Sequence, residues 1–284
     1  MNLVAPPADS TTSRLAEAVT RRVGLRTTDA LRKVVSSLAG VEEGYRLAYV
    51  QRMIAASPSD REWIDFVERM LVHETYFFRH TAQVDFLRDD ILPRLDAERR
   101  NAGRPVLTVW IAGCSTGEEA WTVAFLAREA HRARAFGEVI PVSILATDLS
   151  ETSLAAAKLG TYERLHGLDS FRAIPSWAAG YFGIGCEETR VWAVPEALRG
   201  GVRFMRHNVL DPPPVSEVDL VVCRNLLIYF DDSANRRAQE NLIAALRPGG
   251  VLMLGPADMP RASGTLEAIG TDLATVYLKT AAVP

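Results

Sequence analysis

The spacing of apolar residues divides the chain into two stretches with different periods. Between residues 13 and 72, apolar positions recur every three or four residues, the period of helices that pack through one face. Helices are predicted at Ser13–Val23, Thr28–Leu38 and Val41–Ala56, with a fourth after the start signal at 57–60. This part of the chain is therefore predicted to be a small helical bundle.

From residue 106 onward, short apolar runs alternate with helical patterns. The predicted strands are Val106–Ala112, Val142–Asp148, Val202–Asn208, Asp219–Asn225 and Val251–Gly255. Helical patterns at 118–131, 150–158 and 232–246 separate several of them. This alternation predicts an α/β fold with a doubly wound parallel sheet, which Ala274–Thr280 would close as an antiparallel strand.

Two segments fall outside this alternation. A helix is predicted over Gln83–Arg99, and residues 161–200 include two short apolar stretches, at 181–185 and 190–194, that resemble an inserted hairpin. The predicted organisation has four parts. They are a disordered tail (1–12), a helical domain (13–80), a linker helix (81–104), and an α/β domain (105–284) with a small antiparallel β-subdomain inserted at about 161–200.

Composition narrows the class of protein. The chain has 284 residues, of which 48% are hydrophobic and 24% charged, and its net charge of −3 argues against general binding to nucleic acid or anionic membranes. No apolar run reaches the roughly 18 residues of a membrane span, and no apolar signal segment begins the chain. The three cysteines (Cys114, Cys186 and Cys223) lack metal-ligand spacing. We therefore expect a reduced, cytoplasmic protein without disulfides, a metal site or insertion into a membrane.

The first predicted strand leads directly into a turn of small residues. Gly113 and Gly117 have the spacing G-x-x-x-G instead of G-x-G-x-x-G, and no lysine follows Gly117, which excludes a P-loop. Glu118 and Glu119 at the helix start would repel a pyrophosphate, but they suit a ligand with an ammonium or sulfonium group. S-adenosylmethionine carries both groups and no phosphate. The alternative is a structural turn capped by acidic residues.

Asp148 ends the second predicted strand. An acidic residue there can accept hydrogen bonds from both ribose hydroxyls of a nucleoside. The alternative is that Asp148 caps the helix that begins near Glu151.

Two further segments carry candidate site residues. Arg224, Asn225 and Tyr229 follow the strand at 220–222, where α/β proteins bind their ligands. Arg79 ends the aromatic run at 75–79 and needs an anionic partner, such as a ligand carboxylate. The aromatic residues themselves, and Phe230, are predicted to be core.

In this order, the segments resemble the CheR family of chemotaxis receptor methyltransferases, over residues 13 to 280. The matching segments are Thr75-x-Phe77-Phe78-Arg79, Ala112 to Glu119, Ala146-Thr147-Asp148, Asn208-Val209-Leu210 and Cys223-Arg224-Asn225-x-x-Ile228-Tyr229-Phe230. The resemblance implies an S-adenosylmethionine-dependent methyltransferase sheet with an N-terminal helical domain and an inserted β-subdomain.

The resemblance also implies roles for individual residues. Arg79 would face the methionyl carboxylate or the reacting centre, and Tyr229 would lie near the transferring methyl. His73 stands where the family usually has Asn, and Gly113 belongs to the glycine turn. With these two, the predicted cofactor-binding residues are His73, Thr75, Arg79, Gly113, Glu119, Asp148, Asn208, Val209, Arg224 and Asn225. Gly255–Asp258 replaces a typical Gly-His-Ser-Glu. Only Arg46 and Arg52 remain where the family often has an arginine-rich face.

The function implied is methylation of glutamate side chains on the cytoplasmic helices of chemotaxis receptors. S-adenosylmethionine would be converted to S-adenosylhomocysteine, and the inserted β-subdomain would contact a receptor C-terminal peptide. The departure at 255–258 motivates an alternative, a regulatory protein that binds S-adenosylmethionine or S-adenosylhomocysteine with little catalysis. A methyltransferase for nucleic acid or small molecules, or a nicotinamide oxidoreductase, fits the sequence less well.

Overall fold

The N-terminal part of the chain is helical. The computed structural model describes residues 10–38, 41–132, 141–163, 170–182, 191–261, 265–271 and 274–280. Helices α1 (Ser10–Val23), α2 (Thr27–Leu38), α3 (Glu43–Ala55) and α4 (Arg61–Glu68) share a core of Leu15, Val34, Met53, Phe66 and their neighbours. The predicted bundle is confirmed. The predicted disordered tail is wrong for residues 10–12, which begin α1, and residues 1–9 lie outside the described residues.

A segment of three helical parts connects the bundle to the sheet. It consists of α5 (Thr81–Phe86), a π-helical turn (Leu87–Ile91) and α6 (Leu92–Asn101), where one uninterrupted helix was predicted. Leu87, Ile91, Leu92 and Leu95 are buried in the same core cluster as residues of the sheet, so an apolar face continues through the π-helical turn. The exact domain boundaries stay predictions.

The sheet is mostly parallel and has seven strands. In spatial order they are β5 (Val202–Arg206), β2 (Val142–Asp148), β1 (Leu107–Ala112), β6 (Val218–Cys223), β7 (Leu246–Leu254), β9 (Ala274–Lys279) and β8 (Leu266–Thr271). The first five pair in parallel, and β9 pairs antiparallel with β7 and with β8. The predicted α/β fold is confirmed. Strand β8 was not predicted, and it places β9 inside the sheet instead of at its edge.

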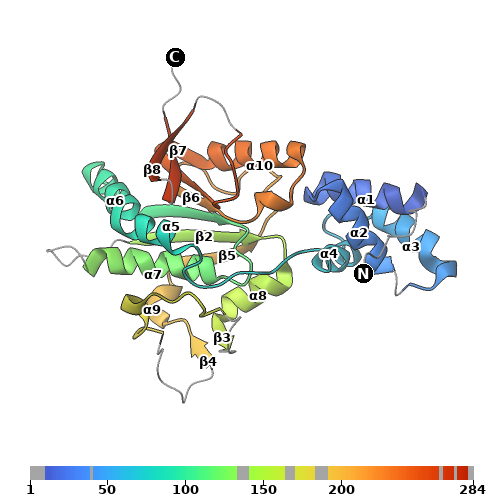
Figure 1. The fold of residues 1–284 in the computed structure, drawn as a ribbon, viewed down its shortest axis with the longest axis horizontal. Coiled ribbons are helices and arrows are strands. Elements are labelled where there is room, and N and C mark those ends of the chain that lie inside the picture. Colours follow the sequence, from blue (N-terminus) through green and yellow to red (C-terminus); the bar gives the residue numbers. More distant parts are fainter. Residues whose placement is uncertain are drawn as a thin grey trace.

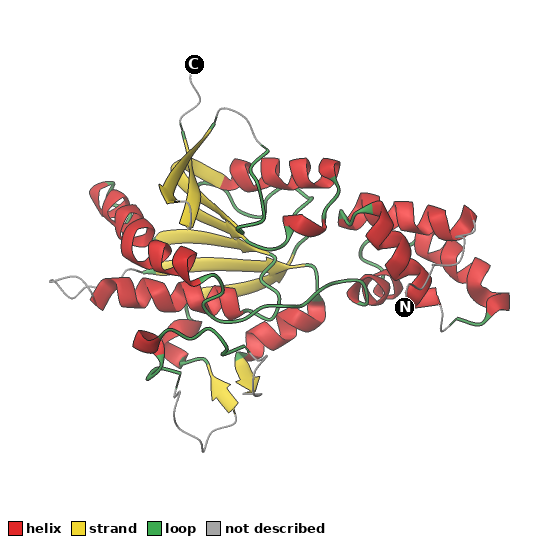
Figure 2. Ribbon diagram, viewed as in Figure 1, coloured by secondary structure: helices red, strands yellow, loops and turns green. Residues whose placement is uncertain are grey.

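Helices cover both faces of the sheet (Figures 1 and 2). Alternate residues of β1 belong to different cores, because successive side chains of a strand point to opposite faces. Val109 and Ile111 pack with α6 and α7 (Glu118–Arg132), whereas Trp110 packs with α10 (Asp232–Ala245). Helix α8 (Glu151–Leu159) follows β2. The strands are therefore apolar on both faces, as a doubly wound sheet requires.

The inserted segment forms a small second sheet. Strand β3 (Thr161–Glu163) pairs antiparallel with β4 (Val191–Ala193), followed by α9 (Glu196–Arg199). The predicted antiparallel insert is present, and residues 191–193 pair with β3. The predicted pairing of 181–185 with 190–194 lies largely outside the described residues. Phe77 contacts the rings of Phe182 and Trp192, and both Phe77 and Phe78 are core, as predicted. Tyr76, also predicted to be core, is only half-buried.

The helical bundle lies beside the carboxyl ends of the strands (Figure 1). Leu25 forms a single β-bridge with Phe230, the Arg26 N–H donates to the Tyr229 carbonyl at 3.0 Å, and the Asp231 N–H donates to the Gly24 carbonyl at 2.9 Å. These contacts position the bundle next to the switch point between β1 and β6, where such sheets bind ligands. Within the described ranges, no helix combines the length and apolar character that crossing a membrane requires.

Candidate functional site

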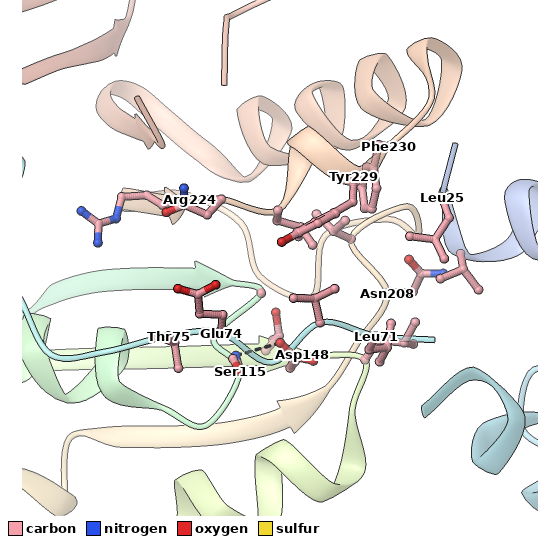
Figure 3. A pocket seen from close by; sticks show the side chains of 18 of the residues that line it. Leu25, Leu71, Glu74, Thr75, Ser115, Asp148, Asn208, Arg224, Tyr229 and Phe230 are labelled. Carbon is pink, nitrogen blue, oxygen red and sulfur yellow. Dashed lines mark hydrogen bonds between the residues drawn. The ribbon is translucent and has the colours of Figure 1, made fainter. Parts of the chain in front are cut away.

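A cleft of about 1030 Å³, partly open to solvent, lies between the carboxyl ends of the strands and the helical bundle. Figure 3 shows side chains from both walls pointing into it. With one exception, the predicted site residues line this cleft: Thr75, Arg79, Gly113, Glu119, Asp148, Asn208, Val209, Arg224, Asn225 and Tyr229. Residues far apart in the sequence are thus brought together at the predicted edge of the sheet.

The turn after β1 depends on its glycines. Gly113 has a φ of 80°, and a Cβ there would lie 2.9 Å from a methyl group of Leu226. Gly117 has a φ of 95°, and a Cβ would lie 2.7 Å from the Cβ of Ala157 on α8. Other residues are strained in this left-handed region and would collide with these neighbours. The glycines therefore let the turn lie close to α8 on one side and to Leu226 in the cleft wall on the other.

The two glutamates at the start of α7 point to different places. Glu118 is buried and accepts hydrogen bonds from the hydroxyls of Thr116 and Ser170, both at 2.6 Å. Burial raises the pKa of Glu118, and these hydrogen bonds partly oppose the increase. Of the two, only Glu119 lines the cleft. The expectation that both carboxylates face a ligand is wrong for Glu118, which joins the turn to the inserted segment.

Glu119 pairs with Arg224 across the switch point. The Arg224 Nε lies 2.5 Å from Oε1 of Glu119, and the two side chains are only 5% and 12% exposed. A second nitrogen of Arg224, Nη1, donates to Gln83 Oε1 at 3.3 Å. A buried ion pair of this kind contributes little net stability because desolvation opposes the attraction. Its location in a cleft makes it a candidate for ligand binding.

Asp148 ties the end of β2 to the glycine turn. One carboxylate oxygen accepts the Ser115 N–H at 2.8 Å and the other accepts the Ser150 N–H at 2.9 Å. The cap of α8 is Ser150, whose hydroxyl accepts the Ser153 N–H, so the capping alternative for Asp148 is wrong. Burial raises the pKa of Asp148, and the two backbone N–H groups oppose the increase. Each carboxylate oxygen can accept a further hydrogen bond, which leaves capacity for a ligand.

Arg79 reaches the cleft from a sharply turned segment. Its neighbours Phe78 and His80 both have left-handed backbones, with φ of 55° and 59°. Its Nη1 donates to the Glu74 carbonyl at 2.8 Å, and its guanidinium lies 5.4 Å from the Tyr76 ring centre. Within the described part of the chain, the buried Nε of Arg79 has no hydrogen-bond partner. A buried, unpaired donor of a cation is unfavourable, so an anionic group of a ligand fits here.

Tyr229 and Asn208 connect the cleft to the helical bundle. Tyr229 ends a 3₁₀ turn (Leu227–Tyr229), and Figure 3 shows its hydroxyl directed into the cleft. The Asn208 amide donates to the Arg22 carbonyl at 2.8 Å and accepts the Leu210 N–H at 3.1 Å. Asn208 is thus held by α1 on one side and by its own loop on the other.

His73 is the exception among the predicted residues, because it is not one of those lining the cleft. Its Nδ1 forms a 2.8 Å hydrogen bond with the Ser153 hydroxyl on α8, and its carbonyl accepts a hydrogen bond from the Ser115 hydroxyl. The predicted contact between the His73 side chain and the cofactor has no support from this position.

Sequence reasoning missed the part of the wall that comes from the helical bundle. Val23, Leu25, Lys33, Met70 and Leu71 all line the cleft. Lys33 donates to the Met70 carbonyl, and burial lowers its pKa. On an amphipathic helix, a lysine normally marks the solvent side, so no local signal assigns Lys33 to a site.

Residues 73–273 match the family described as CheR methyltransferase, SAM binding domain. The chain belongs to the CheR methyltransferase family. A chemotaxis protein methyltransferase of Borreliella burgdorferi is 28% identical and covers 90% of each chain. Chemotaxis protein methyltransferase 1 of Pseudomonas aeruginosa is 34% identical over 74% of this chain and 73% of its own. Chemotaxis protein methyltransferase Cher2 of Pseudomonas putida is 33% identical over 74% of both.

As a CheR methyltransferase, the chain is an S-adenosylmethionine-dependent enzyme. The residues of the cleft fit that cofactor. The unpaired Nε of Arg79 suits a carboxylate, and the carboxylates of Glu119 and Asp148 suit an ammonium group and hydroxyls. The lining of this cleft contains three carboxylates and three cations, so it offers partners for both the ammonium and the carboxylate of the methionyl group. They are Glu74, Glu119, Asp148, Lys33, Arg79 and Arg224.

Proposed function

We propose that this methyltransferase converts glutamate side chains of chemotaxis receptors to methyl esters, with S-adenosylmethionine bound in the cleft described above. The names of the relatives, chemotaxis protein methyltransferases, support the receptor as the acceptor. The observation that carries the proposal is the convergence of Asp148, Arg79 and the buried Arg224–Glu119 pair in one cleft.

Each group has a proposed role toward the cofactor. Asp148 accepts hydrogen bonds from the ribose hydroxyls, and Arg79 binds the methionyl carboxylate or the carboxylate at the reacting centre. Glu119, fixed by Arg224, lies near the methionyl ammonium. Val209 and Leu25 supply apolar surface for the adenine. Thr75, Asn208 and Asn225 complete the lining.

The reaction requires orientation more than acid–base chemistry. Bound S-adenosylmethionine supplies an activated methyl group and a good leaving group. The acceptor carboxylate is already ionised near pH 7, so no side chain has to remove a proton. Arg79 and the Tyr229 hydroxyl hold the acceptor in line with the methyl and help to exclude water. Orientation of this kind lowers the activation free energy of a reaction by roughly 7–11 kcal/mol in favourable cases.

The partners follow from the same proposal. The acceptor is a cytoplasmic helix of a receptor, and methylation removes a negative charge from it, which biases a two-state signalling equilibrium. A cytoplasmic location and peptide docking on the insert at 161–200 stay predictions.

A labelled-methyl assay tests the proposal directly. Membranes that contain chemotaxis receptors of the source organism are incubated with the protein and methyl-labelled S-adenosylmethionine, and the modified residue is then located. We expect label on receptor glutamates as a base-labile ester. Arg79→Ala should abolish transfer, whereas Arg69→Ala, which removes an exposed arginine on the bundle, should not.

Two results would contradict the proposal. Label on another residue type would replace the glutamate assignment. Tight binding of S-adenosylhomocysteine without label on any receptor would favour the regulatory alternative.

A further inference from the structure

The Arg224–Asn225 corner of the cleft has an unfavourable backbone conformation. Asn225 has a φ of 58°, in the left-handed region that most residues other than glycine avoid and that asparagine tolerates better than most. Asn225 lines the cleft, and so does Arg224, whose ion pair with Glu119 forms part of the wall. Such a conformation persists only where surrounding groups hold it. The residues that hold it lie outside the cleft lining.

The first of these residues is Asp258, in the loop after β7. Its Oδ2 accepts the backbone N–H of Asn225 at 3.0 Å, and the residue is only 5% exposed. Within the described residues, its other oxygen, Oδ1, is buried and has no hydrogen-bond partner. A Cβ at Gly255 would lie 2.8 Å from both the Asn225 nitrogen and Asp258 Oδ2. Only glycine at 255 leaves room for this contact.

The second residue is His80, at the start of α5. Its Nε2 lies 3.2 Å from the side-chain oxygen of Asn225, within hydrogen-bond distance. One turn further along α5, Gln83 donates to the Leu254 carbonyl at 2.8 Å and accepts from Arg224 at 3.3 Å. The first turn of α5 therefore contacts both residues of the corner and the end of β7.

We propose that Asp258 and His80 are positioning residues for the cofactor site, which hold the backbone and the side chain of Asn225 so that Arg224 and Asn225 face the cleft. This inference depends on the proposed function in one respect, because it assumes that the cleft is the cofactor site. It assigns a role to the Gly255–Asp258 segment, which departs from the usual family pattern and yet keeps a carboxylate. It also assigns a role to His80, which borders the aromatic run.

The hydrogen bonding of Asp258 distinguishes positioning from simple structural support. A buried carboxylate with one unpaired oxygen is a poor stabilising element, because the unpaired acceptor loses its hydration. Replacement by an apolar residue of similar size removes that unfavourable acceptor but also leaves the Asn225 N–H without a partner, so the two effects on stability oppose each other. What the carboxylate supplies is an acceptor for the Asn225 N–H. Loss of the acceptor should therefore affect ligand affinity more than stability.

Three variants separate these effects, with S-adenosylhomocysteine titrated calorimetrically and the thermal midpoint measured for each. Asp258→Leu removes the acceptor, and we expect the Kd to rise about tenfold while the midpoint falls no further than it does in the control variant described below. Asp258→Asn keeps an oxygen that can accept the same N–H, and it should bind within about twofold of the original chain.

The matched control is Gln239→Leu. Gln239 is buried and supports the same loop, because it donates to the Met259 carbonyl at 3.0 Å and accepts the Arg261 N–H at 2.7 Å. It has no hydrogen bond to Arg224 or Asn225 among the described residues. We expect Gln239→Leu to lower the midpoint and to leave the Kd unchanged.

The contribution of His80 is tested by a double-mutant cycle. His80→Phe keeps a planar ring and removes Nε2, and we expect the Kd to rise about threefold to tenfold. Combined with Asp258→Leu, its effect should be clearly smaller than in the original chain, since both residues act through Asn225.

The proposal is overturned if Asp258→Leu binds S-adenosylhomocysteine as the original chain does, or if Gln239→Leu raises the Kd as much as Asp258→Leu does. It is also overturned if the effects of Asp258→Leu and His80→Phe on the Kd add independently in the double variant. Failure of the original chain itself to bind S-adenosylhomocysteine would instead contradict the assignment of the cleft as the cofactor site.

Discussion

At the scale of single residues, the behaviour of each carboxylate depends on what surrounds it. Burial raises the pKa of Glu118, Asp148 and Asp258, but they have different partners. Glu118 accepts from two hydroxyls, Asp148 from two backbone N–H groups, and Asp258 from one N–H with its second oxygen unpaired. Buried carboxylates whose pKa values are raised for the same reason therefore differ in the groups that they bind.

Asp148→Ala should weaken the binding of S-adenosylhomocysteine by about 1–3 kcal/mol, because ligand hydroxyls lose their acceptor. Part of the loss comes from the glycine turn, since Asp148 also holds the Ser115 N–H. Calorimetric titration measures the change. The control is Asp60→Ala, which removes an exposed aspartate that accepts the Ser57 N–H and does not line the cleft. Equal affinities for Asp148→Ala and the original chain would refute the ribose assignment.

Glu118→Gln should reduce the pH dependence of stability. Burial raises the folded-state pKa of Glu118 above its ordinary value of 4.5. A raised pKa means that protonation favours the folded state, so this contribution is present below about pH 4.5 and is lost as pH rises through the folded-state pKa. The free energy of unfolding, measured with urea between about pH 4 and pH 8, should fall more steeply in the original chain than in Glu118→Gln. Parallel curves would show that Glu118 titrates normally.

At the scale of elements, the glycine turn determines how closely α7 and α8 approach. Gly117→Ala should destabilise the protein by about 2–4 kcal/mol, because it combines left-handed strain with a 2.7 Å contact to Ala157. The control variant Gly103→Ala separates backbone strain from the steric contact, since Gly103 has a φ of 67° and nothing within 4 Å of the position of a Cβ. We expect Gly103→Ala to lower the free energy of unfolding by about 1–2 kcal/mol. Similar urea midpoints for both variants would mean that packing against α8 contributes nothing.

The elements that could be predicted from the sequence are those with a strong local pattern. Strand β1 is an apolar run that ends at a glycine, and α7 begins at two acidic residues, so both were found with little error. Strand β3 has three residues and only one buried side chain, and β8 has none that is buried. Neither contains an apolar run. Strand β3 pairs with β4, about 30 residues away, whereas β8 pairs with β9, which follows it directly. Local pattern therefore identified the parallel strands and the antiparallel strand β9, and missed β3 and β8.

The same distinction applies to the candidate site. Arg79, Asp148 and Arg224 were found because each lies at the end of a recognisable segment. His80 and Asp258 reach Asn225 only after the chain has folded, since 145 and 33 residues separate them from it. Neither the periodicity of apolar residues nor the spacing of motifs predicts contacts between residues that are so far apart in the sequence. Sequence reasoning thus found residues that line the cleft more readily than residues that position them.

At the scale of the whole molecule, the cleft belongs to both the bundle and the sheet. Leu25 and Lys33 line it from the helical bundle, and Asp148 and Asn208 line it from the ends of strands. The link between the two parts includes backbone contacts around Leu25 and Phe230 and exposed ion pairs such as Arg61–Glu151. It also includes the hydrogen bonds from Asn208 to Arg22 and from Ser150 to Glu68. Exposed ion pairs of this kind are worth about 0–1 kcal/mol. Because both parts line the cleft, a ligand bound there should add to the free energy that holds them together.

Hydrogen exchange measures this coupling. At a concentration about 100 times its Kd, S-adenosylhomocysteine should slow exchange of the Arg26 and Asp231 amides by up to about 100-fold, because opening of the link also opens the binding site. Both amides donate across the link, to Tyr229 and Gly24. The internal control is the Thr108 amide, which donates to Asp219 at the opposite end of β1 and should change less if the link opens locally. Unchanged exchange at Arg26 and Asp231 would show that the sheet alone binds the ligand, while equal slowing at all three amides would show that the bundle and sheet open only by global unfolding.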